Sequence, residues 1–185
     1  MRIFIAIDLD NEIKKNLSLL ILKLNKGNRN IKWVKNQGMH MTLKFLGEIK
    51  KEKVSEIESA LLEVTKEYKS FPLRFKGTGT FPPGKKVPRV LWIGIERCEI
   101  LKSLQSRLEE ELEKLDFPKE NREFHPHLTL GRVKTSFVLG PTLSEFEIHN
   151  NTDFGEMEVN KITLFMSTLK PTGAEYTVIS EFELK

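Results

Sequence analysis

The sequence predicts an α+β fold, a bilobal pseudo-two-fold arrangement of two mainly antiparallel sheets with helices packed outside and a cleft between the lobes. Three observations support it. Segments with helical and strand periodicity alternate, with hairpin-like strand pairs and no glycine-rich strand-to-helix turn. The pattern His-x-Thr-Leu occurs once in each half of the chain. No Gly/Ser-rich linker separates the halves, so we expect residues 1–185 to form a single domain made of two lobes.

The first half of the chain alternates between strand and helix patterns. Clusters of Ile, Phe and Val predict strands, and apolar residues recurring every three or four positions predict helices. We expect strands over residues 2–8, 31–34 and 39–46, and helices over residues 11–24 and 53–68. Asp10 is placed to cap the first helix, and Gly27 stands where a C-cap glycine is typical. Gly47 is expected to end the third strand.

The second half repeats this alternation. We expect strands over residues 71–80, 87–95, 127–133, 159–169 and 176–184, a long helix over 99–115 and a short helix over 144–149. Between the first two of these strands, residues 81–86 (FPPGKK) have the chemistry of a loop. The lysines of this loop could grip an RNA backbone or could simply be solvated.

Composition indicates a globular protein with a mild preference for anionic partners. The chain is 39% hydrophobic and 30% charged, with a net charge of +4. A small positive excess favours RNA or a phosphate compound, although a solvated surface is the simpler explanation because the excess is small and the charges are mixed. Cys98 is the single cysteine, which suits a reducing compartment. We see no signal peptide and no apolar run near the roughly 20 residues that span a bilayer, and we expect a cytoplasmic monomer without membrane contact.

The repeated tetrapeptide is the strongest functional signal. The chain has four histidines, at positions 40, 125, 127 and 149, and two of them begin the repeat. Average residue usage would produce such a coincidence in roughly two of ten thousand chains. The two histidines of the repeat stand 87 positions apart (127 minus 40), about half the chain length. We therefore expect the two units to face each other across the cleft.

Strand geometry gives each unit a polar face. Residues two apart in a strand point the same way, so His40 lies beside Thr42, and His127 beside Thr129. An imidazole titrates near neutral pH and can give or take a proton, while a hydroxyl can donate to a phosphate oxygen. Two such units flanking a phosphorus suit in-line displacement without a metal ion. The plainer interpretation makes the histidines satisfied core groups and the threonines ordinary strand residues, but it leaves the repeat unexplained.

The chain resembles the two-histidine phosphoesterases, in particular the RNA 2′,3′-cyclic phosphodiesterases of the LigT type, which are also called 2′-5′ RNA ligases. The resemblance rests on residues 2–9 (RIFIAIDL), 40–47 (HMTLKFLG) and 126–132 (PHLTLGR). Residues 89–92 (RVLW), the length and the motif order extend it over nearly the whole chain.

This resemblance implies metal-free hydrolysis of a terminal RNA 2′,3′-cyclic phosphate to a 2′-phosphate, without a cofactor. It implies that His40 and His127 are the acid–base pair and that Thr42 and Thr129 hold the phosphate. Run backwards, the reaction would join RNA through a 2′-5′ linkage. The sequence leaves open which histidine is the base, and whether a tRNA half, a short oligonucleotide or a cyclic mononucleotide is the natural substrate.

Three residues near the motifs are secondary candidates. Simple alternation aims Arg132 away from the site, but Gly131 could allow a bulge that brings it back to bind phosphate or RNA. Simple alternation also aims Phe45 away from the site, and its role could be either base stacking or core packing. Lys44 is expected on the face of His40 and Thr42, as a solvated lysine or as an added positive charge.

Two other functions remain as alternatives. His40, His125 and His127 could form a three-histidine zinc site of a metal-dependent hydrolase, although the threonines would then have no role. A non-catalytic module that binds RNA or nucleotides could keep the same cleft, but binding alone would not need two imidazoles.

Overall fold

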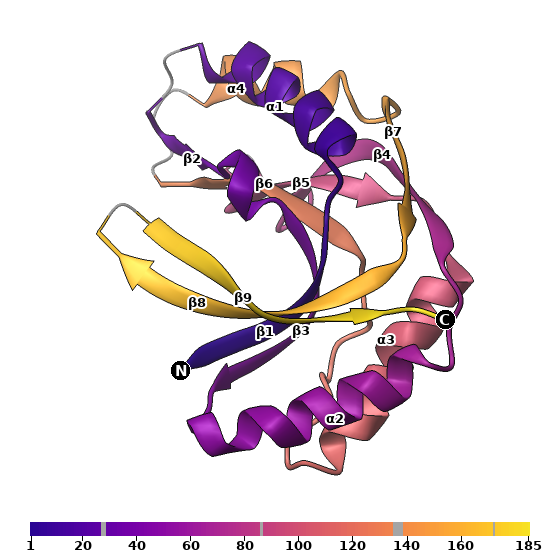
Figure 1. Cartoon of the computed structure of the whole chain (residues 1–185). Helices are drawn as coiled ribbons and strands as arrows, with labels where there is room; N and C mark the ends of the chain where they lie inside the picture. The colour runs from indigo at the N-terminus through magenta and orange to yellow at the C-terminus, as the bar shows by residue number, and fades with distance from the viewer. Residues whose placement is uncertain (27–28, 86, 135–138, 172) are drawn as a thin grey trace.

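The structure, a computed structural model, describes residues 1–26, 29–85, 87–134, 139–171 and 173–185. Their strands form two sheets in which every pairing is antiparallel (Figure 1). One sheet has the order β3-β1-β8-β9, with β1 at Arg2–Asp8, β3 at His40–Glu48, β8 at Lys161–Lys170 and β9 at Gly173–Glu183. The other has the order β2-β6-β5-β4-β7, with β2 at Ile31–Trp33, β6 at His127–Val133, β5 at Val90–Ile95, β4 at Phe71–Phe81 and β7 at Asp153–Val159. Each sheet thus carries one of the two motif strands, β3 or β6.

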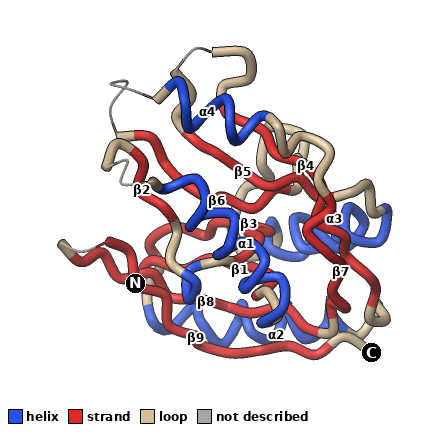
Figure 2. Tube along the Cα trace, turned by 90° about the horizontal axis from the view of Figure 1, so that it is seen from above, coloured by secondary structure: helices blue, strands red, loops and turns tan. Residues whose placement is uncertain are grey.

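Helices cover the outside of both sheets. Helix α1 (Asn11–Asn25) contacts β7 and α4 (Gly140–Glu147) on the five-stranded sheet. Helix α3 (Glu99–Glu113) contacts β3, and α2 (Val54–Thr65) contacts β9, on the four-stranded sheet. Figure 1 shows α1 and α4 at the top and α2 and α3 at the bottom, and Figure 2 shows α1 above the strands when the molecule is seen from above. The predicted bilobal α+β architecture is confirmed.

Helix α1 shows how the local sequence sets an element. The side chain of Asp10 accepts a hydrogen bond from the backbone N–H of Ile13 at 2.8 Å, as expected for the N-cap residue. Every buried residue of the helix is apolar, and these residues follow helical spacing: Ile13, Leu17, Leu20 and Leu24. The predicted C-cap glycine at position 27 lies outside the described residues.

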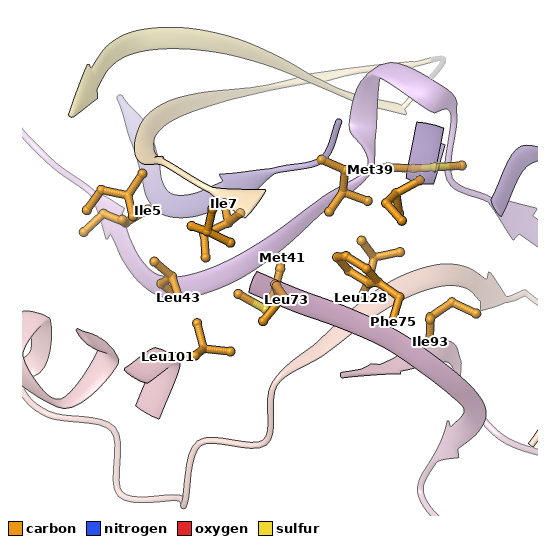
Figure 3. Close-up of a cluster of buried hydrophobic side chains, with 14 of the residues drawn as sticks. Ile5, Ile7, Met39, Met41, Leu43, Leu73, Phe75, Ile93, Leu101 and Leu128 are labelled. Carbon is orange, nitrogen blue, oxygen red and sulfur yellow. The ribbon is translucent and has the colours of Figure 1, made fainter. Parts of the chain in front are cut away.

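The main core lies between the two sheets. Figure 3 shows apolar side chains of both sheets in one cluster, among them Ile5, Met41 and Leu43 from one sheet and Leu73 and Leu128 from the other. Met41 and Leu128 each follow a motif histidine and are fully buried. Their burial anchors the two motif strands, so the alternate residues face away from this core.

The structure corrects several predicted boundaries. The sequence pattern predicts no element at residues 153–158, where the structure has β7, and the strand expected at 159–169 begins at Lys161 instead. Helix α4 lies at Gly140–Glu147 rather than at 144–149, and β5 begins at Val90 rather than at residue 87. Two short 3₁₀ helices, η1 (Asn36–Gly38) and η2 (Lys51–Lys53), precede β3 and α2. Of the loop predicted at 81–86, Phe81 belongs to β4 and residue 86 lies outside the described residues.

Candidate active site

The two motif strands contact each other and line one cavity of about 280 Å³. The six residues that the sequence nominated for catalysis or substrate binding all line this cavity: His40, Thr42, Phe45, His127, Thr129 and Arg132. The first three come from β3 in one sheet and the last three from β6 in the other. The structure therefore brings two His/Thr pairs, distant in sequence, to a single cleft.

A β-bulge interrupts β3 three residues after its histidine. Thr42 pairs with Ala6 and Lys44 pairs with Ile5, so Leu43 has no partner on β1. Leu43 and Lys44 are both buried although they are consecutive in a strand. An extra residue of this kind reverses the alternation of side chains beyond it.

The same irregularity occurs in β6. Thr129 pairs with Trp92 and Gly131 pairs with Leu91, which leaves Leu130 without a partner on β5. Leu130 and Gly131 are consecutive and both buried, as in β3. The sequence suggested this bulge from Gly131, and the structure contains it.

These bulges explain how Phe45 and Arg132 reach the cavity. Each stands five positions after a motif histidine and would face away from it in a regular strand. After the reversal, both are exposed and line the cavity, Phe45 with 56% of its surface accessible. An exposed aromatic ring and an exposed guanidinium therefore occupy equivalent places in the two lobes.

The bulge also overturns the expected position of Lys44. Instead of sharing the face of His40, its side chain is buried in an ion pair with Glu109 of α3 and donates a hydrogen bond to the carbonyl of Pro118 at 2.9 Å. Glu109 also accepts hydrogen bonds from the Gln105 side chain at 3.0 Å and from the backbone N–H of Glu120 at 3.2 Å. Lys44 therefore attaches β3 to α3 on the side away from the cleft and does not line the cavity.

The ring of His127 is held by the backbone. Its Nδ1 lies 2.8 Å from the carbonyl oxygen of His125. A carbonyl can only accept, so Nδ1 of the neutral ring carries the proton and Nε2 presents a lone pair. Phe81 packs edge-on against the ring with centroids 5.0 Å apart, and Trp92 lies at 6.3 Å. The ring orientation is thus fixed before any substrate binds.

His40 has more apolar surroundings. Its ring lies 4.8 Å from Phe4, 4.9 Å from Tyr176 and 5.8 Å from Phe165, measured between centroids. Burial lowers the pKa of His40 to about 4, against opposing contributions from the negative charge of Asp8 and a hydrogen bond to the backbone of Gly38. At neutral pH this imidazole is uncharged. Both histidines bond to the backbone two residues before them, which matches the symmetry of the repeat.

Sequence reasoning missed part of the cavity wall. Among the further lining residues, Arg2 and Phe4 come from β1, Ser167 and Leu169 from β8 and Tyr176 from β9. The register of β8 on β1 places Ser167 opposite Arg2. No motif marks these residues, because they reach the cleft only through sheet pairing.

The structure does not assemble the alternative metal site. His125 is exposed and does not line the cavity. In the described parts of the chain, no three His, Cys, Asp or Glu side chains are placed to hold one metal ion. The alternative of a zinc site formed by His40, His125 and His127 is therefore wrong, because the three side chains do not come together. Over the same described residues, no helix is long and apolar enough to cross a membrane.

Comparison with protein families gives two consecutive matches to one model. The model, described as LigT-like phosphoesterase, matches residues 7–92 and again residues 93–176. Each match contains one of the two motif strands, so the family model itself divides this chain into two equivalent halves.

Relatives align over the full length of the chain. It is 38% identical to the RNA 2′,3′-cyclic phosphodiesterase of Archaeoglobus fulgidus, over 99% of this chain and 100% of that one. It is 39% identical to the protein of the same name from Thermotoga maritima, over 100% of this chain and 96% of that one. Among solved structures, TT0787 of Thermus thermophilus superposes with a TM-score of 0.84 at 30% identity, over 100% and 98% of the two chains. E. coli LigT complexed with 3′-AMP has a TM-score of 0.79 at 24% identity, over 99% and 97%, and so supports the fold alone.

Proposed function

Because the chain belongs to the LigT-like phosphoesterase family, we propose that it hydrolyses RNA 2′,3′-cyclic phosphate ends to 2′-phosphates with a pair of histidines and without a metal ion. The observation that carries the proposal is the placement of two matched His/Thr pairs, one from each lobe, on a single cavity. The names of the full-length relatives support the choice of substrate.

In the proposed reaction, one imidazole takes a proton from water as the water oxygen attacks phosphorus. The bond between phosphorus and the 3′-oxygen breaks, and the other imidazole gives its proton to that oxygen, which leaves a 2′-phosphate. His40 is uncharged at neutral pH because of its burial, so we assign it the role of base. We assign His127 the role of acid in its protonated form, in which Nδ1 still donates to the carbonyl of His125 and Nε2 carries the proton that is transferred. In the reverse direction these roles exchange, and a 5′-hydroxyl would add to the cyclic phosphate to form a 2′-5′ linkage.

The remaining cavity residues bind the substrate in this proposal. Thr42 and Thr129 donate hydrogen bonds to the non-bridging oxygens, on which negative charge grows in the transition state. Arg132 pairs with a phosphate, for which its planar guanidinium is suited. Phe45 offers its exposed ring to the terminal base, since stacking on an aromatic face is typical of single-stranded RNA recognition.

The test is hydrolysis of an oligonucleotide with a 2′,3′-cyclic phosphate end, with and without EDTA. We expect activity in both conditions, and we expect His40→Ala and His127→Ala each to reduce kcat by at least about 10²-fold while the protein stays folded. His125→Ala is the matched control, because its side chain lies outside the cavity and its backbone carbonyl, which holds His127, remains.

Three outcomes would contradict the proposal. Loss of activity in EDTA with recovery in zinc would show a metal enzyme. Near-normal turnover by either motif variant would remove the acid–base pair. Tight binding of the oligonucleotide without any turnover would favour the non-catalytic module.

A further inference from the structure

A second cavity of about 430 Å³ adjoins the one that holds the histidines. It lies between β2 and η1 on one side and the start of β9 on the other, which are at the left of the view in Figure 1. Arg132, Tyr176 and Gly38 line both cavities, so the two share a wall. Lys32 and Lys35 line only the second cavity, and no motif pointed to them.

The second cavity has an unneutralised positive wall. Lys32, Lys35 and Arg132 are exposed. None of the three forms an ion pair with a carboxylate of the described residues, although many other lysines and arginines of the chain do. One acidic residue, Glu175, also lines this cavity, but its carboxylate is paired with Lys170 at 2.6 Å. The remaining charge favours an anion.

Strand pairing concentrates this charge. Lys32 is the cross-strand partner of Arg132, and like charges directly opposite each other are unfavourable. The Lys32 ammonium also reaches across to β9, where a Cβ atom added to Gly173 would lie 2.9 Å from its Nζ. The fold therefore places two cations on neighbouring strands beside the second cavity, where a bound phosphate would lessen their repulsion.

We propose that this second cavity binds the single-stranded RNA immediately 5′ of the cyclic phosphate, with Lys32 and Lys35 against its backbone phosphates. The inference rests on the proposed function, because the cyclic phosphate must first occupy the histidine cavity. The phosphate ends the strand at its 3′ side, so every other nucleotide must leave that cavity in the 5′ direction. At about 280 Å³ the first cavity is at the small end of common small-molecule pockets, which span ~300–1,000 Å³, so it suits one terminal nucleotide and leaves the upstream nucleotides outside. Trp33 and Tyr176 line the second cavity as aromatic surfaces on which bases can stack.

The experiment compares 2′,3′-cyclic AMP with a hexanucleotide that ends in the same cyclic phosphate. The variant is Lys32→Gln with Lys35→Gln. Glutamine is used because a carboxylate at position 32 would pair with Arg132. The matched control is Lys15→Gln with Lys69→Gln, which removes the same charge from exposed lysines that line neither cavity.

We expect the Lys32/Lys35 variant to raise KM for the hexanucleotide roughly tenfold, with kcat unchanged. The slope of log KM against log salt concentration should become shallower by about 0.7 for each backbone phosphate that the variant no longer binds. Turnover of the cyclic mononucleotide should not change, and the control variant should behave as the wild type.

Equal effects on both substrates, no effect on the hexanucleotide, or the same effect in the control would overturn the subsite. Binding of a labelled, 3′-phosphorylated hexanucleotide by fluorescence anisotropy separates this result from failure of the proposed function. If the wild type hydrolyses neither substrate, the activity proposal fails. The subsite proposal still holds if the Lys32/Lys35 variant binds the hexanucleotide more weakly than the wild type and the control variant does not. It fails if the Lys32/Lys35 variant binds as tightly as the wild type.

Discussion

His40 and His127 occupy equivalent positions in the repeat but meet different surroundings. Three aromatic rings surround His40, whereas His127 contacts two, those of Phe81 and Trp92. Burial disfavours the charged imidazole, and this separates two residues that the sequence leaves equivalent. The lobes are alike in backbone geometry, and the aromatic neighbours make the two histidines unlike.

We expect the acidic limb of the kcat/KM profile to lie near pH 4 to 5, well below the ordinary histidine pKa of 6.5, because the pKa of His40 is about 4. The folded pKa is depressed, so the neutral ring stabilises the fold fully above pH 6.5, and this stabilisation is lost as pH falls toward 4. NMR titration of the His40 ring checks the assignment. Tyr176→Ala should expose the ring and raise its pKa, and Phe81→Ala, beside the other histidine, should not. An acidic limb at 6.5 that follows His40 would contradict this prediction.

The elements that carry the site are irregular strands. Each motif strand continues for several residues past a bulge, and the bulge decides which later side chains enter the cleft. Gly131 is central to the bulge of β6, because a Cβ atom there would lie 2.9 Å from Ile31 Cγ2 and 2.9 Å from Trp33 Cε3 on β2. Strand β2, which pairs with β6, therefore leaves room only for a glycine at this position.

Replacing Gly131 by alanine should destabilise the protein by about 1–3 kcal/mol through overpacking, and should raise KM by displacing Arg132. Urea unfolding and steady-state kinetics measure the two effects. Gly140→Ala is the matched control, since no atom would lie within 4 Å of the added methyl group. Wild-type stability in Gly131→Ala would mean that β2 moves freely, and the account of the bulge would then be wrong.

Regular elements could be predicted from sequence, and irregular ones only in part. Strand β1 matches its predicted bounds because its apolar run is continuous, and β6 matches because its motif is bounded by a proline. Strand β7 was missed because its apolar residues are interrupted by Gly155, which has a φ of +113°. In the structure Gly155 packs closely against the side chain of Ile13, which belongs to a segment distant in sequence.

The same limit applies to the site. The alternation of side chains along a strand predicted that each His/Thr pair shares a face. Gly131 suggested a bulge that directs Arg132 toward the cleft. Nothing local indicated the bulge of β3, because Leu43 and Lys44 are ordinary strand residues. The bulge turns Lys44 toward a buried partner that belongs to α3, distant in the sequence. Arg2, Tyr176, Lys32 and the other newly found wall residues likewise depend on pairing between distant strands.

At the scale of the whole molecule, the two lobes share one core. Side chains of both sheets form a single buried cluster, as Figure 3 shows. The chain passes from the first motif strand into β4 of the other sheet, and later from β7 back into β8. Each lobe thus contains strands from both halves of the sequence, and we expect them to unfold together.

Lys44→Met tests this cooperativity. It leaves the buried carboxylate of Glu109 without its cation, which should cost about 3–5 kcal/mol. Both tryptophans lie in the five-stranded sheet, on β2 and β5, whereas this ion pair joins β3 of the other sheet to α3. Their fluorescence transition in urea should nevertheless shift to lower concentration together with the far-UV circular dichroism transition.

Two further variants complete this test. Adding Glu109→Gln to Lys44→Met should recover much of the stability, because a neutral amide replaces the unpaired charge. Lys170→Met, in the exposed pair with Glu175, should change stability little. Separate fluorescence and dichroism midpoints in Lys44→Met would show two independently folding lobes.

The matching bulges also bear on how such a cleft could originate. Each bulge comes three residues after its motif histidine, yet a buried lysine follows it in β3 and a glycine follows it in β6. The backbone path is therefore more alike between the halves than the side chains along it. A half-length ancestor encoding one strand of this shape could have formed the cleft as a symmetric pair of identical chains. Fusion of two copies would then have freed each half to change, one toward an exposed aromatic ring at Phe45 and the other toward an exposed guanidinium at Arg132.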